Sequence, residues 1–256
     1  MLKDLTREDW LGFLDLPEER VPSVLVLRGT RNLRTNYDKY RAYFEDVVEV
    51  GSPNALFEDV FIGRRDGIDV GYASVYGAPM ASEITHVFAV LGTELVIQTG
   101  VCGALGDGIE AGDLVIATKA RCAEGAAACY LPEVEKVDAT PDLVAALMSD
   151  PAVTVPRHAG PVWTTAALLA EGQAEIDQWH GEGYIAADME TATTFAVAAH
   201  FGVRRVSILS VFDNPRHGAH LGLTESHKGA ARATGEAAML EMTFRLIARR
   251  SSPDSV

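Results

Sequence analysis

Two carboxylate side chains follow apolar segments of the kind that form buried strands. The first is Glu190, in the segment AADMETATTFAVAAH, where a short strand is expected to end and a helix of small residues to begin. The two oxygens of a carboxylate can accept hydrogen bonds from two neighbouring hydroxyl groups, as on a ribose. Met189 would offer an adaptable apolar surface beside such a sugar. A helix-capping role fits the charge pattern of Glu190 equally well.

The second carboxylate is Asp213, in the segment ILSVFDNPRHG. The apolar neighbours Val211, Phe212 and Pro215 would exclude water from its carboxyl group and raise its pKa. A carboxyl group of that kind can share a proton with a leaving group. The alternative is an Asx turn after a strand, which the Asn-Pro pair favours.

A glycine turn follows another apolar strand, in ELVIQTGVCGALGDGIEAGDLVIAT. Gly100 and Gly103 favour close approach of a ligand to the backbone, although tight packing alone would also require small residues. The strand delivers Gln98 to the turn. Because Gln98 is neutral, an anion bound at this turn would need its charge from another segment.

The segment LRGTRNLRTNY carries such charge: its Arg28, Arg31 and Arg34 lie around Gly29. The planar fork of an arginine can hold two phosphate oxygens at once, and a glycine lets the backbone come close as well. Solvated surface charges, or partners for acidic neighbours, are the alternative interpretation of these arginines.

These residues require elements that bring them together. Short apolar segments alternate with helical ones, which predicts an α/β fold with a mixed, largely parallel sheet and helices on both faces. Ligands in such sheets bind beyond the carboxyl ends of the strands. That rule singles out the loops at 28–35, 100–103, 188–190 and 213–215. Strands are expected at 23–27, 67–77, 95–99, 113–120, 184–188 and 204–212, and helices at 37–47, 79–91, 141–148, 189–200 and 225–249.

The overall composition excludes several classes of function. With 22 Lys+Arg against 36 Asp+Glu, the net charge of −14 disfavours binding to nucleic acid or anionic lipid. No apolar run approaches the length of a membrane span. Residues 1–20 lack the apolar run of a signal peptide, and the three cysteines contain no C-x-x-C pair, so a reduced, cytoplasmic chain is expected. His217, His220 and His227 are too loosely spaced to predict a metal site.

Three segments, in this order and spacing, resemble the nucleoside phosphorylase family, which includes hexameric purine nucleoside phosphorylases, uridine phosphorylases and methylthioadenosine nucleosidases. The resemblance spans about 24–247 and implies a three-layer α/β/α sandwich around a mixed, barrel-like central sheet. We therefore expect one domain over 1–256, with an extension at 1–20 and a frayed tail at 251–256. The segments are GAPMASEITHVFAVLGTELVIQTGVCGALGDGIEAGDLVIAT, EGAAACYLP and YIAADMETATTFAVAAHFGVRRVSILSVFDN.

The resemblance also implies roles for individual residues. Met189 and Glu190 would bind the ribose, with Glu190 on its 2′ and 3′ hydroxyls. Tyr130 falls where the family stacks an aromatic side chain on the base, and Asp213 falls where purine-acting members hydrogen-bond or protonate N7. The pyrimidine-acting members lack that aspartate, so Asp213 favours a purine. A carboxylate at the sugar and a proton at the base would oppose the charges that develop as the N-glycosidic bond breaks.

The chain departs from the family at the anion site. The phosphorylases place an arginine where this chain has Gln98, and a Ser or Thr where it has Val101. Gly29 with Arg31 or Arg34, or with Arg28, would have to supply the site, with Gln98 and Gly100 beside it. The nucleosidases also carry a neutral amide on the strand, but their first loop holds a carboxylate that 28–35 lacks.

Phosphorolysis of a purine-type nucleoside is therefore the expected activity. Hydrolysis to free base and ribose is one alternative, and a non-catalytic nucleoside-binding protein is the other. The family implies no metal and no cofactor, with inorganic phosphate as the possible co-substrate. It also implies a homo-oligomer, with a dimer as the minimal unit and a hexamer as a larger form. The exact base and the 5′ substituent are left open.

Overall fold

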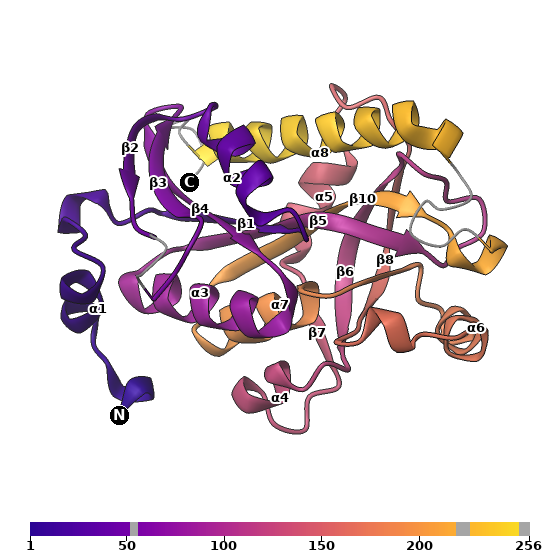
Figure 1. Ribbon diagram of the computed structural model, residues 1–256, viewed down its shortest axis with the longest axis horizontal. Coiled ribbons are helices and arrows are strands. Elements are labelled where there is room, and N and C mark those ends of the chain that lie inside the picture. Colours follow the sequence, from indigo (N-terminus) through magenta and orange to yellow (C-terminus); the bar gives the residue numbers. More distant parts are fainter. Residues whose placement is uncertain (52–55, 219–225, 251–256) are drawn as a thin grey trace.

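A computed structural model describes residues 1–51, 56–218 and 226–250 of the chain (Figure 1). His220 and the expected frayed tail at 251–256 lie outside the described residues. The strands are β1 (Val24–Gly29), β2 (Glu45–Glu49), β3 (Val60–Arg65), β4 (Ile68–Val75), β5 (Leu95–Ala104), β6 (Leu114–Cys122), β7 (Lys136–Asp138), β8 (Arg157–Thr164), β9 (Ala186–Asp188) and β10 (Arg204–Asp213). The α-helices are α1 (Arg7–Phe13), α2 (Leu33–Arg41), α3 (Gly77–Leu91), α4 (Ala126–Tyr130), α5 (Pro141–Met148), α6 (Gln173–Gly181), α7 (Thr191–His200) and α8 (Gly229–Arg250).

The central sheet closes on itself over part of its width. Its strand order is β10-β6-β8-β9-β5-β1-β4-β3-β2, and β10 also pairs with β5. Strands β5, β10, β6, β8 and β9 therefore form a closed ring, from which β1, β4, β3 and β2 extend. The pairs β1–β5, β10–β5 and β6–β8 are parallel, whereas β10–β6 and β5–β9 are antiparallel. The expected mixed, barrel-like sheet is confirmed.

The sheet is covered on both faces, which gives the three layers expected from the sequence. Figure 1 shows α8, α2 and α5 on one side and α3, α7 and α4 on the other. Alternation along β1 explains how one strand serves both layers, since successive side chains of a strand point to opposite faces. Val24 and Val26 belong to the core beneath α8, whereas Leu25 and Leu27 pack with Phe88 of α3.

Several predicted elements differ from the observed ones. The helix expected at 37–47 begins earlier, at Leu33, and ends at Arg41, and the residues after the next turn form β2. Strand β8 was not expected at all, because Gly160 and Pro161 in its middle are poor strand formers. Among the described residues, every helix is too short or too polar to span a membrane.

Candidate active site

A cavity of about 790 Å³ lies at the carboxyl ends of β1, β5, β9 and β10. This is the position that the strand-end rule predicts. Each of the four loops singled out from the sequence contributes to its wall. The lining includes Gly29 and Arg31 from the first loop, Val101 to Gly103 from the second, Asp188 to Glu190 from the third and Asp213 from the fourth.

Glu190 is the N-cap residue of α7, but its side chain makes no capping hydrogen bond. Its side chain is 5% exposed, and its Oε1 accepts a hydrogen bond of 2.7 Å from the backbone N–H of Gly77. The capping role belongs to Asp188 instead, whose Oδ2 accepts from the backbone N–H of Thr191 at 2.9 Å. The side chain of Glu190 therefore does not cap the helix, and its carboxyl group lies at the cavity wall.

Asp188 is fixed by a set of buried hydroxyl groups. The Thr164 hydroxyl donates to Oδ1 at 2.7 Å, and the Thr191 hydroxyl donates to Oδ2. Burial raises the pKa of Asp188, and it also raises the pKa of Glu190, to which the nearby charge of Asp188 adds. Ionisation of one of these two carboxyl groups therefore disfavours ionisation of the other, as expected for like charges in a low-dielectric site.

Gly29 allows Glu190 to pack against β1. A Cβ atom on Gly29 would lie 2.6 Å from Oε2 of Glu190 and 3.1 Å from Nε2 of Gln98. Any side chain at this position would displace the carboxylate. The close approach that requires a glycine is therefore an approach to Glu190, in addition to any approach to a bound anion.

Gln98 and Gly100 lie behind the cavity wall. The Gln98 amide is fully buried, donates to the carbonyl of Thr99 at 3.0 Å and accepts from the Thr194 hydroxyl at 2.9 Å. Gly100 packs against the carbonyl of Gly29, which would lie 3.4 Å from an added Cβ. Neither residue lines the cavity, so the structure does not bear out their expected contact with phosphate or water.

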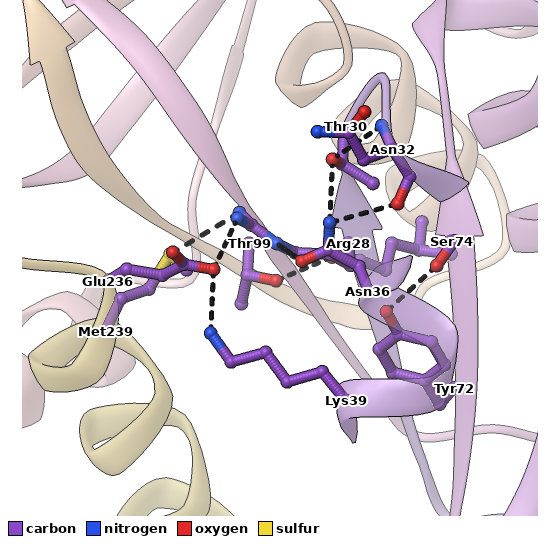
Figure 2. A network of polar contacts seen from close by, with 11 residues as sticks. Arg28, Thr30, Asn32, Asn36, Lys39, Tyr72, Ser74, Thr99, Glu236 and Met239 are labelled. Carbon is purple, nitrogen blue, oxygen red and sulfur yellow. Dashed lines mark hydrogen bonds and ion pairs between the residues drawn. The ribbon is translucent and has the colours of Figure 1, made fainter. Parts of the chain in front are cut away.

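Arg28 is a buried cation in the cavity lining, and Figure 2 shows the polar contacts around it. Its side chain is 3% exposed, and its Nε donates to Oδ1 of Asn36 at 3.3 Å. Its Nη2 donates to Oε1 of Glu236 on α8 at 3.3 Å, and the same oxygen accepts from Nζ of Lys39 at 3.0 Å. The network holds the guanidinium at one position at the end of β1.

The other two arginines of this loop differ from each other. Arg31 lines the cavity, and its guanidinium carbon lies 4.7 Å from the centre of the Tyr76 ring. Arg34 does not line the cavity. Its side chain is 68% exposed and pairs with Asp38 and Asp59, each at 3.2 Å. Arg34 is thus a partner for acidic neighbours, and its expected role at an anion site is not supported.

Asp213 ends β10, and β10 and β1 both pair with β5. It is 7% exposed and lies beside Gly103, where an added Cβ would be 3.3 Å from its Oδ1. Val211, Phe212 and Pro215 line the cavity around it. The apolar surroundings expected from the sequence are therefore present at this carboxyl group. Met189 also lines the cavity, next to Glu190.

Tyr130 lies elsewhere. It ends α4, and its hydroxyl is 3.1 Å from Nδ1 of His86 on α3. Its ring contacts His86 and His200 edge to face, with centroids 5.8 and 5.6 Å apart. The cavity lining does not include it. The structure therefore does not place Tyr130 where it could stack on a base in this cavity.

A different segment supplies the wall that sequence reasoning missed. Thr165, Leu168, Glu171, Ile176 and Trp179 all line the cavity. They follow β8, the strand that was not predicted, so its strand-end loop was not singled out. Among the residues that the structure describes, no group of three or more His, Cys, Asp or Glu side chains could hold a metal ion.

Comparisons with known proteins agree with this architecture. The sequence model of the Phosphorylase superfamily matches residues 42–248. A guanosine phosphorylase from Halorubrum lacusprofundi is 33% identical over 154 residues, which cover 58% of this chain and 63% of that enzyme. A DeoD-type purine nucleoside phosphorylase from Myxococcus xanthus is 28% identical over 201 residues, covering 74% of this chain and 80% of that one. The crystal structure of a uridine phosphorylase from Vibrio fischeri superposes with a TM-score of 0.77 at 22% identity, over 90% of this chain and 94% of the other, and shows the shared fold.

Proposed function

Because the chain belongs to the phosphorylase superfamily, we propose that it cleaves the N-glycosidic bond of a purine-type nucleoside and transfers the ribosyl group to phosphate. One observation carries this proposal. Two buried carboxyl groups, Glu190 and Asp213, and a buried guanidinium, Arg28, line the same cavity. The reaction needs three functions at one place: stabilisation of a cation-like sugar, protonation of a leaving base and binding of an anion.

Glu190 acts on the sugar. Breaking the glycosidic bond leaves positive charge on the ribosyl ring, as in glycoside hydrolysis. Because burial raises the pKa of Glu190, its anionic form is costly unless a positive charge faces it. The interaction between Glu190 and the ribosyl ring is therefore strongest when positive charge develops on the sugar. An interaction that is stronger in the transition state than in the bound substrate accelerates the reaction, whereas one that is equally strong in both only improves binding. The hydrogen bond from Gly77 fixes one oxygen and orients the other.

Asp213 acts on the base. The leaving purine gains negative charge, and a carboxyl group near N7 can share a proton with it. The apolar residues Val211, Phe212 and Pro215 keep water from competing for that proton. The aspartate and the similarity to a guanosine phosphorylase and to DeoD-type purine nucleoside phosphorylases support a purine over a pyrimidine.

Arg28 supplies the anion site. Strand β1 lies beside β5, and Leu27 and Arg28 pair with Gln98 and Thr99 in register. Arg28 therefore offers a positive charge one register position beyond Gln98, although its side chain lies on the face toward α8 and that of Gln98 on the face toward α7. A guanidinium held in place by Asn36 and Glu236 has little entropy left to lose when phosphate binds. Arg31 adds a second cation to the lining.

Hydrolysis is the second candidate, and Glu236 is the observation that favours it. This carboxylate lines the cavity beside Arg28 and could orient a water molecule. Burial acts to raise the pKa of Glu236, but the hydrogen bond from Lys39 and the charge of Arg28 outweigh burial and leave its pKa lowered. A carboxylate with a lowered pKa is a weak general base, so phosphorolysis is the better supported reaction.

Phosphate dependence tests the proposal. We expect release of base from guanosine, inosine or adenosine to require phosphate and to saturate with it, and uridine to be a poor substrate. Release that is the same from zero to millimolar phosphate would identify a nucleosidase. No release from any nucleoside, with binding retained, would identify a binding protein.

Arginine variants locate the anion site. In Arg28→Lys the positive charge remains, but the planar guanidinium that can hold two phosphate oxygens is lost. We expect the KM for phosphate to rise about 10- to 100-fold, which corresponds to the loss of one or two charge-assisted hydrogen bonds. Arg31→Ala should raise it less. Arg34→Ala is the matched control, because Arg34 lies outside the cavity lining, and it should leave the KM unchanged. An unchanged KM in Arg28→Lys would remove Arg28 from the site.

A further inference from the structure

Tyr130 lies outside the cavity, but it connects the two helices that hold Glu190 at the cavity wall. Its hydroxyl group is 3.1 Å from Nδ1 of His86 on α3, and its carbonyl oxygen accepts a hydrogen bond of 3.1 Å from Nδ1 of His200, the last residue of α7. At the start of α3, the N–H of Gly77 donates to Glu190, which is the N-cap residue of α7. The same two helices are therefore joined twice, once at the catalytic carboxylate and once through Tyr130.

Further contacts hold the short helix α4 against α3 and α7 at both of its ends. At its start, Oε1 of Glu124 accepts hydrogen bonds from the Thr193 hydroxyl of α7 and from the backbone N–H of Ala127. At its end, the Tyr130 ring contacts both imidazole rings, and the Phe201 ring stands edge to face with each of them at a centroid distance of 4.9 Å. The spacing of α3 and α7 therefore depends on this histidine–tyrosine cluster.

The hydrogen bond between Tyr130 and His86 depends on the protonation of His86. When neutral His86 carries its proton on Nε2, its Nδ1 accepts from the Tyr130 hydroxyl. Protonation makes Nδ1 a donor, so this arrangement is lost and a second positive charge lies near His200. Burial lowers the pKa of His86, and the charge of His200 lowers it further. The folded cluster therefore favours neutral His86.

The other charged groups on the surrounding helices do not remove this preference. Glu83, one turn before His86 on α3, and Cys129 on α4 raise the pKa of Tyr130 in addition to the effect of burial. On α1, Arg7 donates to the Leu91 carbonyl at the end of α3. Because the folded pKa of His86 lies below its ordinary value of 6.5, the cluster contributes its full stability above pH 6.5 and loses stability as pH falls below that value.

We propose that Tyr130 is a positioning residue that joins α3 to α7 through His86 and His200, and that acid weakens both this junction and the hydrogen bond from Gly77 to Glu190. This inference rests on the proposed role of Glu190 in the reaction. A helix in a packed layer moves largely as one body, so a shift at the cluster changes the spacing of α3 and α7 at the cavity wall. Tyr130 acts through the two helices and contacts no substrate.

The first measurement follows hydrogen exchange of the Gly77 amide by NMR and needs no substrate. His86→Gln keeps a hydrogen-bonding side chain but cannot be protonated, and Glu190 is present in both proteins. We expect the protection factor of Gly77 in the wild type, divided by that in His86→Gln, to fall about 3- to 10-fold between pH 7.5 and pH 5.5. Tyr130→Phe, which loses only the hydroxyl group, should lower the protection already at pH 7.5. His158→Gln is the control, because His158 is a partly buried histidine outside the cluster and the cavity lining, and it should follow the wild type.

Kinetics tests the consequence for Glu190. The kcat of the wild type with guanosine and phosphate, divided by that of His86→Gln, should fall by a similar factor between the same two pH values. The ratio of their KM values should stay constant, because the cluster contacts neither substrate. A constant kcat ratio despite a change in Gly77 protection would overturn the positioning role of Tyr130.

The exchange measurement separates this inference from the proposed reaction. A protection ratio that is equal at both pH values, or wild-type protection in a folded Tyr130→Phe, overturns the junction even if nucleosides are cleaved. The predicted change in Gly77 protection in a protein that cleaves no nucleoside would support the junction and refute the proposed reaction alone.

Discussion

At the scale of single residues, two neighbouring acids divide their tasks. Asp188 accepts from the Thr164 and Thr191 hydroxyls and from the start of α7, so its oxygens are committed to structure. Glu190 receives one hydrogen bond from Gly77 and faces the cavity with its second oxygen close to Gly29. The sequence placed Glu190 correctly beside a strand end. It could not show which acid caps the helix, because Asp188 is oriented in part by the Thr164 hydroxyl from β8, a strand that the sequence did not predict.

Glu190→Gln tests this division. The variant keeps the shape of the side chain but loses the charge that opposes the developing cation on the sugar. We expect kcat to fall by a factor that corresponds to roughly 2–4 kcal/mol of transition-state stabilisation, with the fold retained. Steady-state kinetics with circular dichroism as the folding control checks it. Near-wild-type turnover in a folded variant would leave Glu190 with a structural role only.

Glu171 should make stability depend on pH. Burial raises its pKa to about 7 in the folded protein, above its ordinary value of 4.5. Between these values the folded state keeps a proton that the unfolded state has lost, so stability falls as pH rises through this window. The free energy of unfolding can fall by about 1.4 kcal/mol per pH unit for a fully buried group. The fall is smaller here, because Glu171 is partly exposed.

Glu171→Gln should remove that slope. The variant should match the wild type near pH 4.5 and be the more stable protein near pH 7.5, as measured by urea unfolding at both values. The other charged residues of the cavity lining are present in both proteins, so only their interactions with Glu171, such as that of Asp213, differ between them. These residues are Arg28, Arg31, Asp188, Glu190, Asp213, Arg232 and Glu236. An equal stability difference at the two pH values would show that Glu171 titrates normally.

At the scale of elements, the strand boundaries decide what could be predicted. The apolar run predicts that the first strand ends at Leu27, which places Arg28 in a loop. In the structure β1 continues to Gly29, and alternation places Arg28 on the same face as Val24 and Val26, toward α8. Had the strand been extended by two residues, the 2-residue period would have predicted a buried arginine. Tyr130 lies outside the cavity lining for another reason: α4 packs against α3 and α7, a contact that no local pattern encodes.

The contact between α8 and β1 gives a prediction of its own. Glu236 partly neutralises Arg28, so Glu236→Gln should strengthen the attraction of Arg28 for an anion. Because Glu236 is 33% exposed, we expect about 1 kcal/mol, or roughly a fivefold lower KM for phosphate. Glu241→Gln, on an exposed position of the same helix, is the control. A KM that rises or stays constant in Glu236→Gln would argue that phosphate binds away from Arg28.

At the scale of the whole molecule, the rim of the cavity exposes apolar side chains. Leu169 is 85% exposed and Val101 is 42% exposed, and both line the cavity. Apolar surface at the mouth of a site is typical of contacts that another subunit covers. We therefore propose a homo-oligomer with a dimer as its minimal unit. The charge of −14 does not oppose this, since the centre of an interface can be apolar.

Light scattering during gel filtration measures the assembly directly. At micromolar concentration we expect a mass of at least two subunits, and Leu169→Asp should shift it toward one. A mass of one subunit for the wild type across this range would contradict the proposed assembly.

The central claim is that the cavity transfers a ribosyl group from a purine to phosphate. The most direct measurement is ³¹P NMR of the protein with guanosine and inorganic phosphate, with the released base quantified in the same sample. We expect a new phosphate-ester signal from ribose 1-phosphate, equal in amount to the guanine released and formed far more slowly by Glu190→Gln. Guanine released together with free ribose and no new phosphorus signal would contradict it.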